Sequence, residues 1–175
     1  MELTLADQYY LKALDHYPYD MEFTIENLNY AISYDEEHAP AKCMLGRVYM
    51  YYIKDYDAAA RSFYEALAAD MNYPDTYKYY SLLRIWEGSY DKASLIIERG
   101  VKVNGMDISM LMIHKALIHE YKREWRSAKI VLKRAKLISI DHKPLSHIDL
   151  VLKRVKNKSK SVKVNKKMKK KAKKK

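Results

Sequence analysis

The 175-residue chain has few of the residues that interrupt helices or cross-link small secreted domains: four glycines, four prolines and one cysteine, Cys43. So little glycine and proline favours an all-helical chain over a β-sandwich or barrel. A single cysteine excludes an internal disulfide framework and fits a reducing compartment. No apolar run reaches the length of about 18 residues that a transmembrane helix needs, and the acidic start, with Glu2 and Asp7, does not resemble a secretory signal. We therefore expect a cytoplasmic protein.

The residue combinations typical of enzymes are also missing. The chain has no glycine-rich phosphate loop, no H-E-x-x-H and no paired cysteines for zinc. His114 and His119 are five residues apart, as are His142 and His147, and this spacing places the two imidazoles on different sides of a helix. We expect neither an enzyme nor a bound metal or cofactor.

One pattern recurs along the chain: an aromatic residue, a small one three positions later, a bulky one after four more, and a small one after three more. The copies are spaced by 34 and 35 residues. A period of this length predicts stacked helical hairpins. A degraded first copy keeps the bulky and final small positions at Leu28 and Ala31. The three full copies are Tyr56, Ala59, Phe63, Ala66; Tyr90, Ala93, Ile97, Gly100; and Trp125, Ala128, Leu132, Ala135.

Leu45, Gly46 and Tyr49 form a stripe just before the Tyr56 copy, and together these residues resemble the tetratricopeptide repeat signature. Later repeats depart from this signature, because Ser81 in the third and Ala116 in the fourth occupy the position of Gly46 in the second repeat. The resemblance implies an all-α fold, a right-handed α-solenoid of about four helix-turn-helix repeats over residues 1–141. The approximate repeat bounds are 4–37, 38–73, 74–107 and 108–141.

The last part of the chain reads differently. Residues 142–155 have amphipathic spacing after Pro144, so we predict a helix that caps the last hairpin. Residues 156–175 are mainly lysine with asparagine, serine and scattered valine. Such a segment buries too little apolar surface to offset ordering, and a disordered Lys-rich tail is expected.

In the tetratricopeptide family the first helix of each hairpin lines a concave groove. Carried over, this register implies a mostly aromatic and aliphatic groove suited to an extended or helical peptide of another protein. The alternative is that several of these side chains pack against a neighbouring helix or the terminal segment. The main groove candidates are Arg47, Met50, Tyr51, Lys78, Leu82, Trp86, Ile113, Leu117 and Tyr121, with Cys43, Ile85 and Glu120 on the same faces and Tyr9, Ala13 and Tyr17 in the first repeat.

The net charge of +11 is unevenly distributed. Residues 1–100 have 9 Lys/Arg against 17 Asp/Glu, whereas residues 153–175 have 14 against none. Flexible lysines attract phosphates regardless of sequence, and without interleaved aromatics they offer no base stacking. The predicted nucleic-acid-binding residues are Lys153, Arg154, Lys156, Lys158, Lys160, Lys163, Lys166, Lys167, Lys169, Lys170, Lys171, Lys173, Lys174 and Lys175.

Three functions stay open at this point. The first is a scaffold that binds a protein segment in its groove and docks on RNA, DNA or a ribosome through its basic end. The second is a protein-binding module of the chaperone or assembly-factor kind, with a merely solubilising tail. The third is an adaptor on an anionic membrane surface, to which each lysine would contribute roughly 1 kcal/mol. A nuclear localisation signal is a further alternative for the tail.

Overall fold

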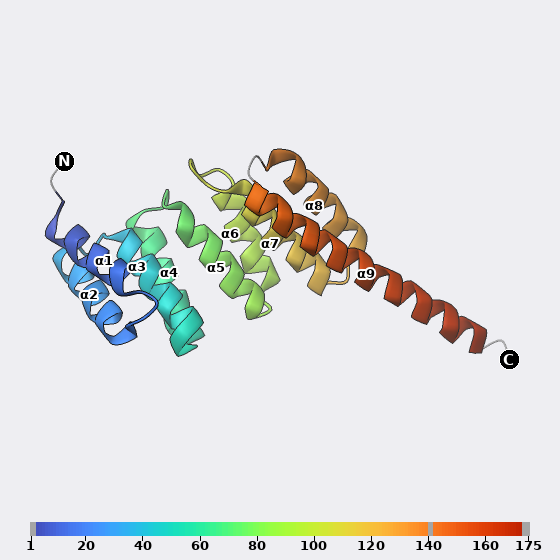
Figure 1. Cartoon of the computed structure of the whole chain (residues 1–175), viewed down its shortest axis with the longest axis horizontal. Coiled ribbons are helices and arrows are strands. Elements are labelled where there is room, and N and C mark those ends of the chain that lie inside the picture. Colours follow the sequence, from blue (N-terminus) through green and yellow to red (C-terminus); the bar gives the residue numbers. More distant parts are fainter. Residues whose placement is uncertain (1–2, 140–141, 173–175) are drawn as a thin grey trace. The chain divides into compact units, whose positions relative to one another are not determined.

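The structure is a computed structural model, which describes the backbone of residues 3–139 and 142–172 and the side chains of 3–139 and 145–162 (Figure 1). Over these ranges the chain is helical and contains no strand, which confirms the predicted all-α class. The chain divides into two compact units, residues 1–106 and 107–175. The division falls inside the stretch predicted to be one solenoid.

Unit 1, residues 1–106, consists of three helix pairs, in each of which the two helices pack mainly on one another. The second pair contains a short π-helical turn, η1, between its helices. The elements are α1 (Leu5–His16), α2 (Met21–Tyr34), α3 (Ala39–Val48), η1 (Tyr49–Ile53), α4 (Tyr56–Ala69), α5 (Pro74–Trp86) and α6 (Tyr90–Gly100).

The helix starts follow from local chemistry. Side chains of Asp20 and Asp55 accept hydrogen bonds from the first-turn amides of α2 and α4, as N-caps do. Thr4 and Asp7 form a capping box at α1, and Pro74 occupies the first turn of α5, where its missing N–H costs nothing. Gly88 ends the α5 segment at φ 75°, a left-handed conformation that glycine adopts without strain.

The repeating positions set the core of unit 1. In α4 the small and bulky positions Ala59, Phe63 and Ala66 are fully buried, while the leading aromatic Tyr56 is the first residue of the helix and is exposed. A Cβ on Gly46 of α3 would lie 2.7 Å from Phe63 Cε1. Glycine at this position therefore makes room for the phenylalanine ring.

Unit 2, residues 107–175, contains α7 (Ile108–Tyr121), α8 (Trp125–Ile138) and α9 (His142–Ala172). α7 and α8 form a pair, and α9 packs along both of them before it continues past them (Figure 1). The contact is apolar, because Ile148, Val151, Leu152 and Val155 of α9 share one buried cluster with Leu132 of α8. The predicted capping contact is thus present, and it groups α9 with α7 and α8.

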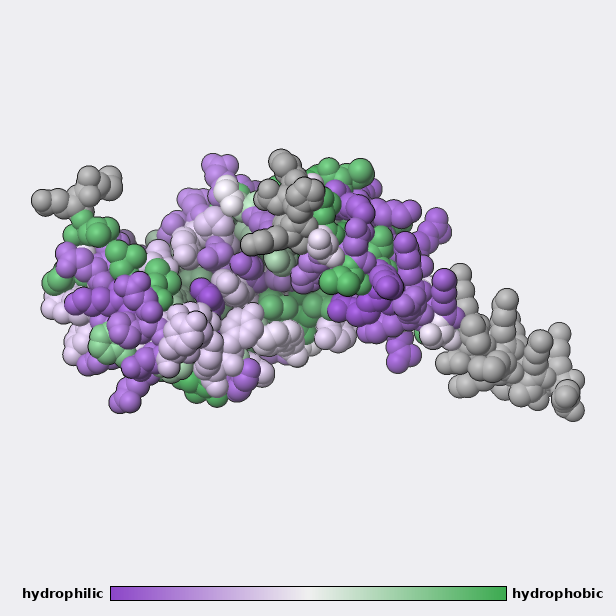
Figure 2. All heavy atoms as spheres, in the orientation of Figure 1, coloured by the Kyte–Doolittle hydropathy of each residue, from purple (hydrophilic) through white to green (hydrophobic). Residues whose placement is uncertain are grey.

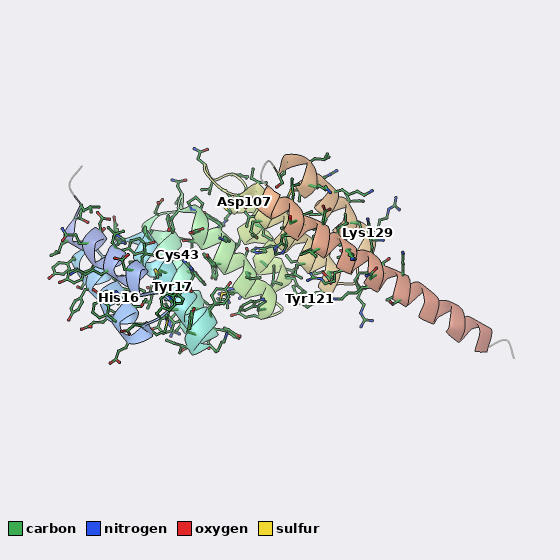
Figure 3. All side chains as sticks on the ribbon, in the orientation of Figure 1. His16, Tyr17, Cys43, Asp107, Tyr121 and Lys129 are labelled. Atoms are coloured by element: carbon green, nitrogen blue, oxygen red, sulfur yellow. The ribbon has the colours of Figure 1, made fainter. Side chains whose placement is uncertain are left out.

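The length of α9 corrects the prediction for the tail. The predicted capping helix ended at residue 155 and disorder was expected from residue 156, yet α9 runs without a break to Ala172. The physical reason is that no glycine or proline follows Pro144, and lysine and alanine are good helix formers. Ser159 is also buried, and its hydroxyl accepts a hydrogen bond from Lys129 Nζ at 3.3 Å. Lys129 belongs to α8 and is labelled in Figure 3. Lys173, Lys174 and Lys175 lie outside the described residues.

Candidate functional site

The first-helix side of unit 1 carries a cluster of aromatic rings around one arginine. We call this cluster the aromatic face and define it by Tyr17, Arg47, Tyr51, Tyr79 and Trp86. These residues come from three different elements and one helix end: the C-cap of α1, then α3, η1 and α5. In Figure 2, side chains of intermediate hydropathy, coloured pale, gather on the visible side of unit 1.

Arg47 is the centre of the aromatic face. Its guanidinium carbon lies 4.5 Å from the Tyr79 ring centroid and 5.3 Å from that of Tyr17, close enough for cation–π attraction to both rings. Its Nε is buried and has no hydrogen-bond partner. Across the described residues no carboxylate forms an ion pair with Arg47. A half-buried cation is thus held in place by rings, without an anion of its own.

Tyr51 and Trp86 form the other end of the aromatic face. Their ring centroids are 5.6 Å apart with the planes nearly perpendicular, and Tyr51 makes a similar contact with Tyr79 at 6.3 Å. Burial raises the pKa of the Tyr51 phenol. Trp86 is 42% exposed, and its ring centroid lies 6.4 Å from that of Tyr56. The indole of Trp86 therefore remains partly open to solvent, and it is linked to Arg47 through the rings of Tyr51 and Tyr79.

Several predicted groove residues of unit 1 belong elsewhere. Met50, Ile85 and Cys43 are buried in the core, with at most 2% of their surface exposed, so their assignment to the groove is wrong. Burial raises the pKa of the Cys43 thiol to about 12, which leaves it unreactive at neutral pH. Leu82 is half-buried against the same core. Lys78 lies at the edge of the aromatic face, with Nζ 4.8 Å from the Tyr79 ring centroid and 3.9 Å from Asp75 Oδ1.

The π-turn η1 explains the error at Met50. Its hydrogen bonds run from i to i+5, so each turn takes up more residues than in an α-helix. Residues after Val48 therefore turn less far around the axis than the predicted register assumed. Tyr51 then points in nearly the direction of Arg47, while Met50 falls short of it and enters the core. No feature of the sequence YMYYI marks a π-turn.

In unit 2 the predicted groove side of α7 is partly covered by α9. Ile113 is buried in the α7–α8–α9 cluster, so it is core rather than groove. Glu120 is 5% exposed and accepts hydrogen bonds from Arg154 Nη2 and Lys158 Nζ, both at 2.7 Å. Burial alone would raise the pKa of the Glu120 carboxyl, but these two donors outweigh it and lower the pKa. Leu117 is half-buried, and Tyr121 is 54% exposed at the end of α7.

These ion pairs also divide the predicted nucleic-acid-binding residues. Arg154 and Lys158 are engaged with Glu120, whereas Lys153, Lys156 and Lys160 are exposed. Hydrophilic side chains predominate over the visible described part of unit 2, with hydrophobic patches among them (Figure 2). Lys163, Lys166, Lys167, Lys169, Lys170 and Lys171 follow on the α9 backbone, but their side chains lie outside the described residues.

Tyr79 is the member of the aromatic face that sequence reasoning missed. It lies three and seven residues before Leu82 and Trp86, which is the spacing of one helix face. This spacing is the signal that could have identified Tyr79, whose neighbour Lys78 lies at the edge of the aromatic face. Tyr17, a predicted groove residue of the first repeat, contacts Arg47, and its ring centroid lies 5.5 Å from that of Tyr52.

No group of three or more His, Cys, Asp or Glu side chains is arranged to hold a metal ion in the part of the chain that the structure describes. No described helix is both long enough and apolar enough to span a bilayer.

The paired helices and their small-to-bulky packing define a helical-repeat fold of the tetratricopeptide type, as predicted. Solved structures with a similar fold include PilW, a widely conserved type IV pilus biogenesis factor, with a TM-score of 0.73 and 13% identity over 91% of this chain and 78% of that one. They also include MamA, with a TM-score of 0.57 and 21% identity over 77% of this chain and 94% of that one. Both are helical-repeat proteins of the tetratricopeptide type. No protein-family model and no curated protein matches the chain.

Proposed function

We propose that this chain is a non-enzymatic scaffold whose aromatic face binds a peptide segment of another protein. The observation that supports this most is the state of Arg47: ordered by two tyrosine rings, half-buried, and without a carboxylate partner in the described part of the chain. The exposed indole of Trp86 belongs to the same cluster, linked to Arg47 through the rings of Tyr51 and Tyr79. Tryptophan, tyrosine and arginine are the residues most often dominant in binding energy at protein interfaces.

The geometry suggests which peptide would fit. A guanidinium offers a planar fork of donors that matches a carboxylate, so Arg47 would take an acidic side chain or a chain-terminal carboxylate. Trp86 and Tyr51 would contact an aliphatic or aromatic anchor a few residues away. Preordering by the tyrosine rings reduces the side-chain entropy that binding has to overcome.

Truncation of the Trp86 or Tyr51 side chain should weaken peptide binding. Peptides can be selected on the immobilised protein from a random displayed library, and the affinity of a selected peptide measured by fluorescence polarisation. Trp86→Ala and Tyr51→Ala are each expected to weaken binding by about 30-fold, which corresponds to the roughly 2 kcal/mol of a dominant interface residue. Arg47→Lys should weaken binding too, since an ammonium lacks the planar fork.

The matched control is Tyr19→Ala, because Tyr19 is 91% exposed in the same unit and lies outside the aromatic face. Its affinity should equal that of the unmodified protein. Selected peptides that bind the Trp86→Ala and Tyr51→Ala proteins unchanged, with circular dichroism showing intact helices, would exclude the aromatic face as the binding site.

Unit 2 supports a second role, docking on RNA, DNA or a ribosome. Charge separates by unit: residues 1–106 have 10 Lys/Arg against 17 Asp/Glu, and residues 107–175 have 23 against 5. Exposed cations lie on α8 at Arg126, Lys133 and Arg134 as well as on α9. A helix that presents lysines to phosphates gives sequence-independent affinity that falls steeply with salt.

A chain that stops after Val162 should lose this affinity without loss of the fold. It lacks nine lysines but keeps Val155, Lys158 and Ser159, which pack on α7 and α8. If six phosphates are contacted, binding of the full chain should fall about a thousandfold between 50 and 200 mM salt, and the shortened chain should lose most of that dependence in filter-binding titrations. Replacement of the same nine lysines by arginine is the matched control and should preserve binding.

The other outcomes identify the alternatives. RNA affinity that is unchanged in the shortened chain would contradict docking through this segment. Flotation with anionic but not neutral vesicles would instead support the membrane adaptor, and binding to neither would leave a protein-binding module of the chaperone or assembly-factor kind. We place the protein in the cytoplasm on sequence grounds, and fractionation of cells that produce it tests this.

A further inference from the structure

A second groove of unit 1 lies among α4, α5 and α6 and is separate from the aromatic face. Its volume is about 710 Å³. α5 contributes Tyr77, which is buried, and Tyr80, which is half-buried, and these form the floor. α4 and α6 supply the walls. We call it the second-helix groove, since α4 and α6 are the second helices of their pairs; its wall residues are Tyr64, Leu67, Ala68, Met71, Lys92, Leu95, Ile96 and Arg99.

The walls have the spacing of two helix stripes. Residues 92, 95, 96 and 99 of α6 are at i, i+3, i+4 and i+7, so this wall is about two turns, or roughly 11 Å, long. Residues 64, 67 and 68 of α4 and residue 71 in the turn after it have the same sequence spacing. Three of the apolar side chains remain open to solvent, with Tyr64 67%, Met71 68% and Leu95 52% exposed. A groove of this length and lining suits the apolar face of a short amphipathic helix.

The charges at this groove are all of one sign. Among the described residues, four ionised side chains line it, those of Arg84, Lys92, Arg99 and Lys102, and no carboxylate does. Arg84 already forms an ion pair with Glu87 at 2.7 Å and donates a hydrogen bond to the Tyr80 hydroxyl at 2.9 Å. Lys92, Arg99 and Lys102 form no ion pair within the described residues. This cationic rim contrasts with unit 1 as a whole, in which 17 Asp/Glu outnumber 10 Lys/Arg.

We infer that the second-helix groove binds an amphipathic helix of a partner protein that carries acidic residues beside its apolar face. The apolar stripe would cover Tyr64, Met71 and Leu95, and carboxylates would meet the Lys92, Arg99 and Lys102 rim. Charge complementarity selects this partner, because a basic helix, including α9 of a second copy, would be repelled. A nucleic acid would leave the exposed apolar walls uncovered.

The probe is a synthetic labelled helix of about 14 residues, with leucine at i, i+3, i+4 and i+7 and glutamate at the flanking positions. Its affinity for the full chain is measured by fluorescence polarisation at 50 mM salt. Lys92→Glu/Arg99→Glu should weaken binding at least tenfold, since each reversal replaces attraction by repulsion. Leu95→Asp, at an exposed position, should do the same. The matched control Lys12→Glu/Lys42→Glu, which makes the same charge change on α1 and α3, should change affinity less than twofold.

Several outcomes would overturn the inference. If the lysines of α9 capture the acidic probe, the groove variants will bind it as well as the unmodified protein. If an analogue with lysine flanks binds equally, charge does not select the partner. A laurate anion that competes with the probe stoichiometrically would assign the groove to a small amphiphile instead. Absence of saturable binding also contradicts it. Trp86→Ala should bind the probe normally, so failure here is distinct from failure at the aromatic face.

Discussion

Phe63→Ala is expected to lower the free energy of unfolding of unit 1 by about 3 to 5 kcal/mol, the usual cost of truncating a fully buried phenylalanine. Phe63 fills the space between α3, α4 and α5, where it contacts Tyr80 at 5.8 Å between ring centroids. Its loss leaves a cavity that Gly46 cannot fill. Urea unfolding followed by circular dichroism measures the change. The neighbouring Tyr64→Ala, at a 67% exposed position of the same helix, should change stability by no more than about 0.5 kcal/mol.

Gly46 provides the sharper test of this packing. Alanine is a better helix former than glycine by about 1 kcal/mol, yet Gly46→Ala should be destabilising because its Cβ would lie 2.7 Å from Phe63 Cε1 and 2.8 Å from Cδ1. In a Phe63→Leu background that clash is relieved, so the same change should become neutral or stabilising. Additive effects of the two substitutions would show that the two residues do not pack as described.

The double variant Arg154→Ala/Lys158→Ala is expected to destabilise unit 2 by about 3 kcal/mol at pH 7. It leaves the Glu120 carboxylate buried without a partner, which is far more costly than the loss of an exposed pair. The carboxyl can avoid being buried with an unpaired charge by binding a proton. For a group of its usual pKa, protonation at pH 7 costs about 3.7 kcal/mol, and this cost limits the penalty of the unpaired charge. Chemical unfolding monitored by Trp125 fluorescence, in a Trp86→Phe background, measures it. The control is the double variant Lys153→Ala/Lys156→Ala, at two exposed positions of α9, and it should change the free energy of unfolding little.

The stability of the unmodified protein and that of the Arg154→Ala/Lys158→Ala variant should depend on pH with opposite signs. In the unmodified protein the pKa of Glu120 is lowered by folding, so its contribution is complete above the unfolded pKa of about 4.3 and is lost as pH falls through the folded value. In the double variant burial without donors should raise the folded pKa, and stability should then increase from pH 7 to pH 5. Glu120→Gln added to the double variant should restore stability at pH 7. A parallel pH response in both proteins would contradict this account.

Much of the fold could be predicted because its determinants are local and repeated. The 34- and 35-residue spacing marks structure directly: Tyr56, Tyr90 and Trp125 are each the first residue of the second helix in a pair. The small and bulky positions that follow, such as Ala59 and Phe63, are buried. Tertiary contacts in such an array are mostly between neighbours in sequence, and so a period in the sequence is enough to indicate them.

The candidate site could be predicted only in part. Arg47, Tyr51 and Trp86 were selected from the helical register and do meet in the aromatic face, whereas Met50 and Ile113 entered the core. Met50 was misplaced by a π-turn, and Ile113 by contacts with α9, which starts about 30 residues later in the chain. The second-helix groove was not predicted at all, since its cations come from α5, α6 and the residues after α6, and no single stretch looks basic.

The sequence by itself determined the helical repeat, the starts of the second helices and the separation of acidic and basic residues, because each depends on spacing or composition along the chain. Only the tertiary structure decided which side chains are available for function. Within the described part of the chain Arg47 has no ion-pair partner, because tyrosine rings rather than carboxylates contact it. Arg154 and Lys158 are engaged because Glu120 lies beneath α9. Availability depends on what packs against a residue, and that neighbour is set by contacts between helices.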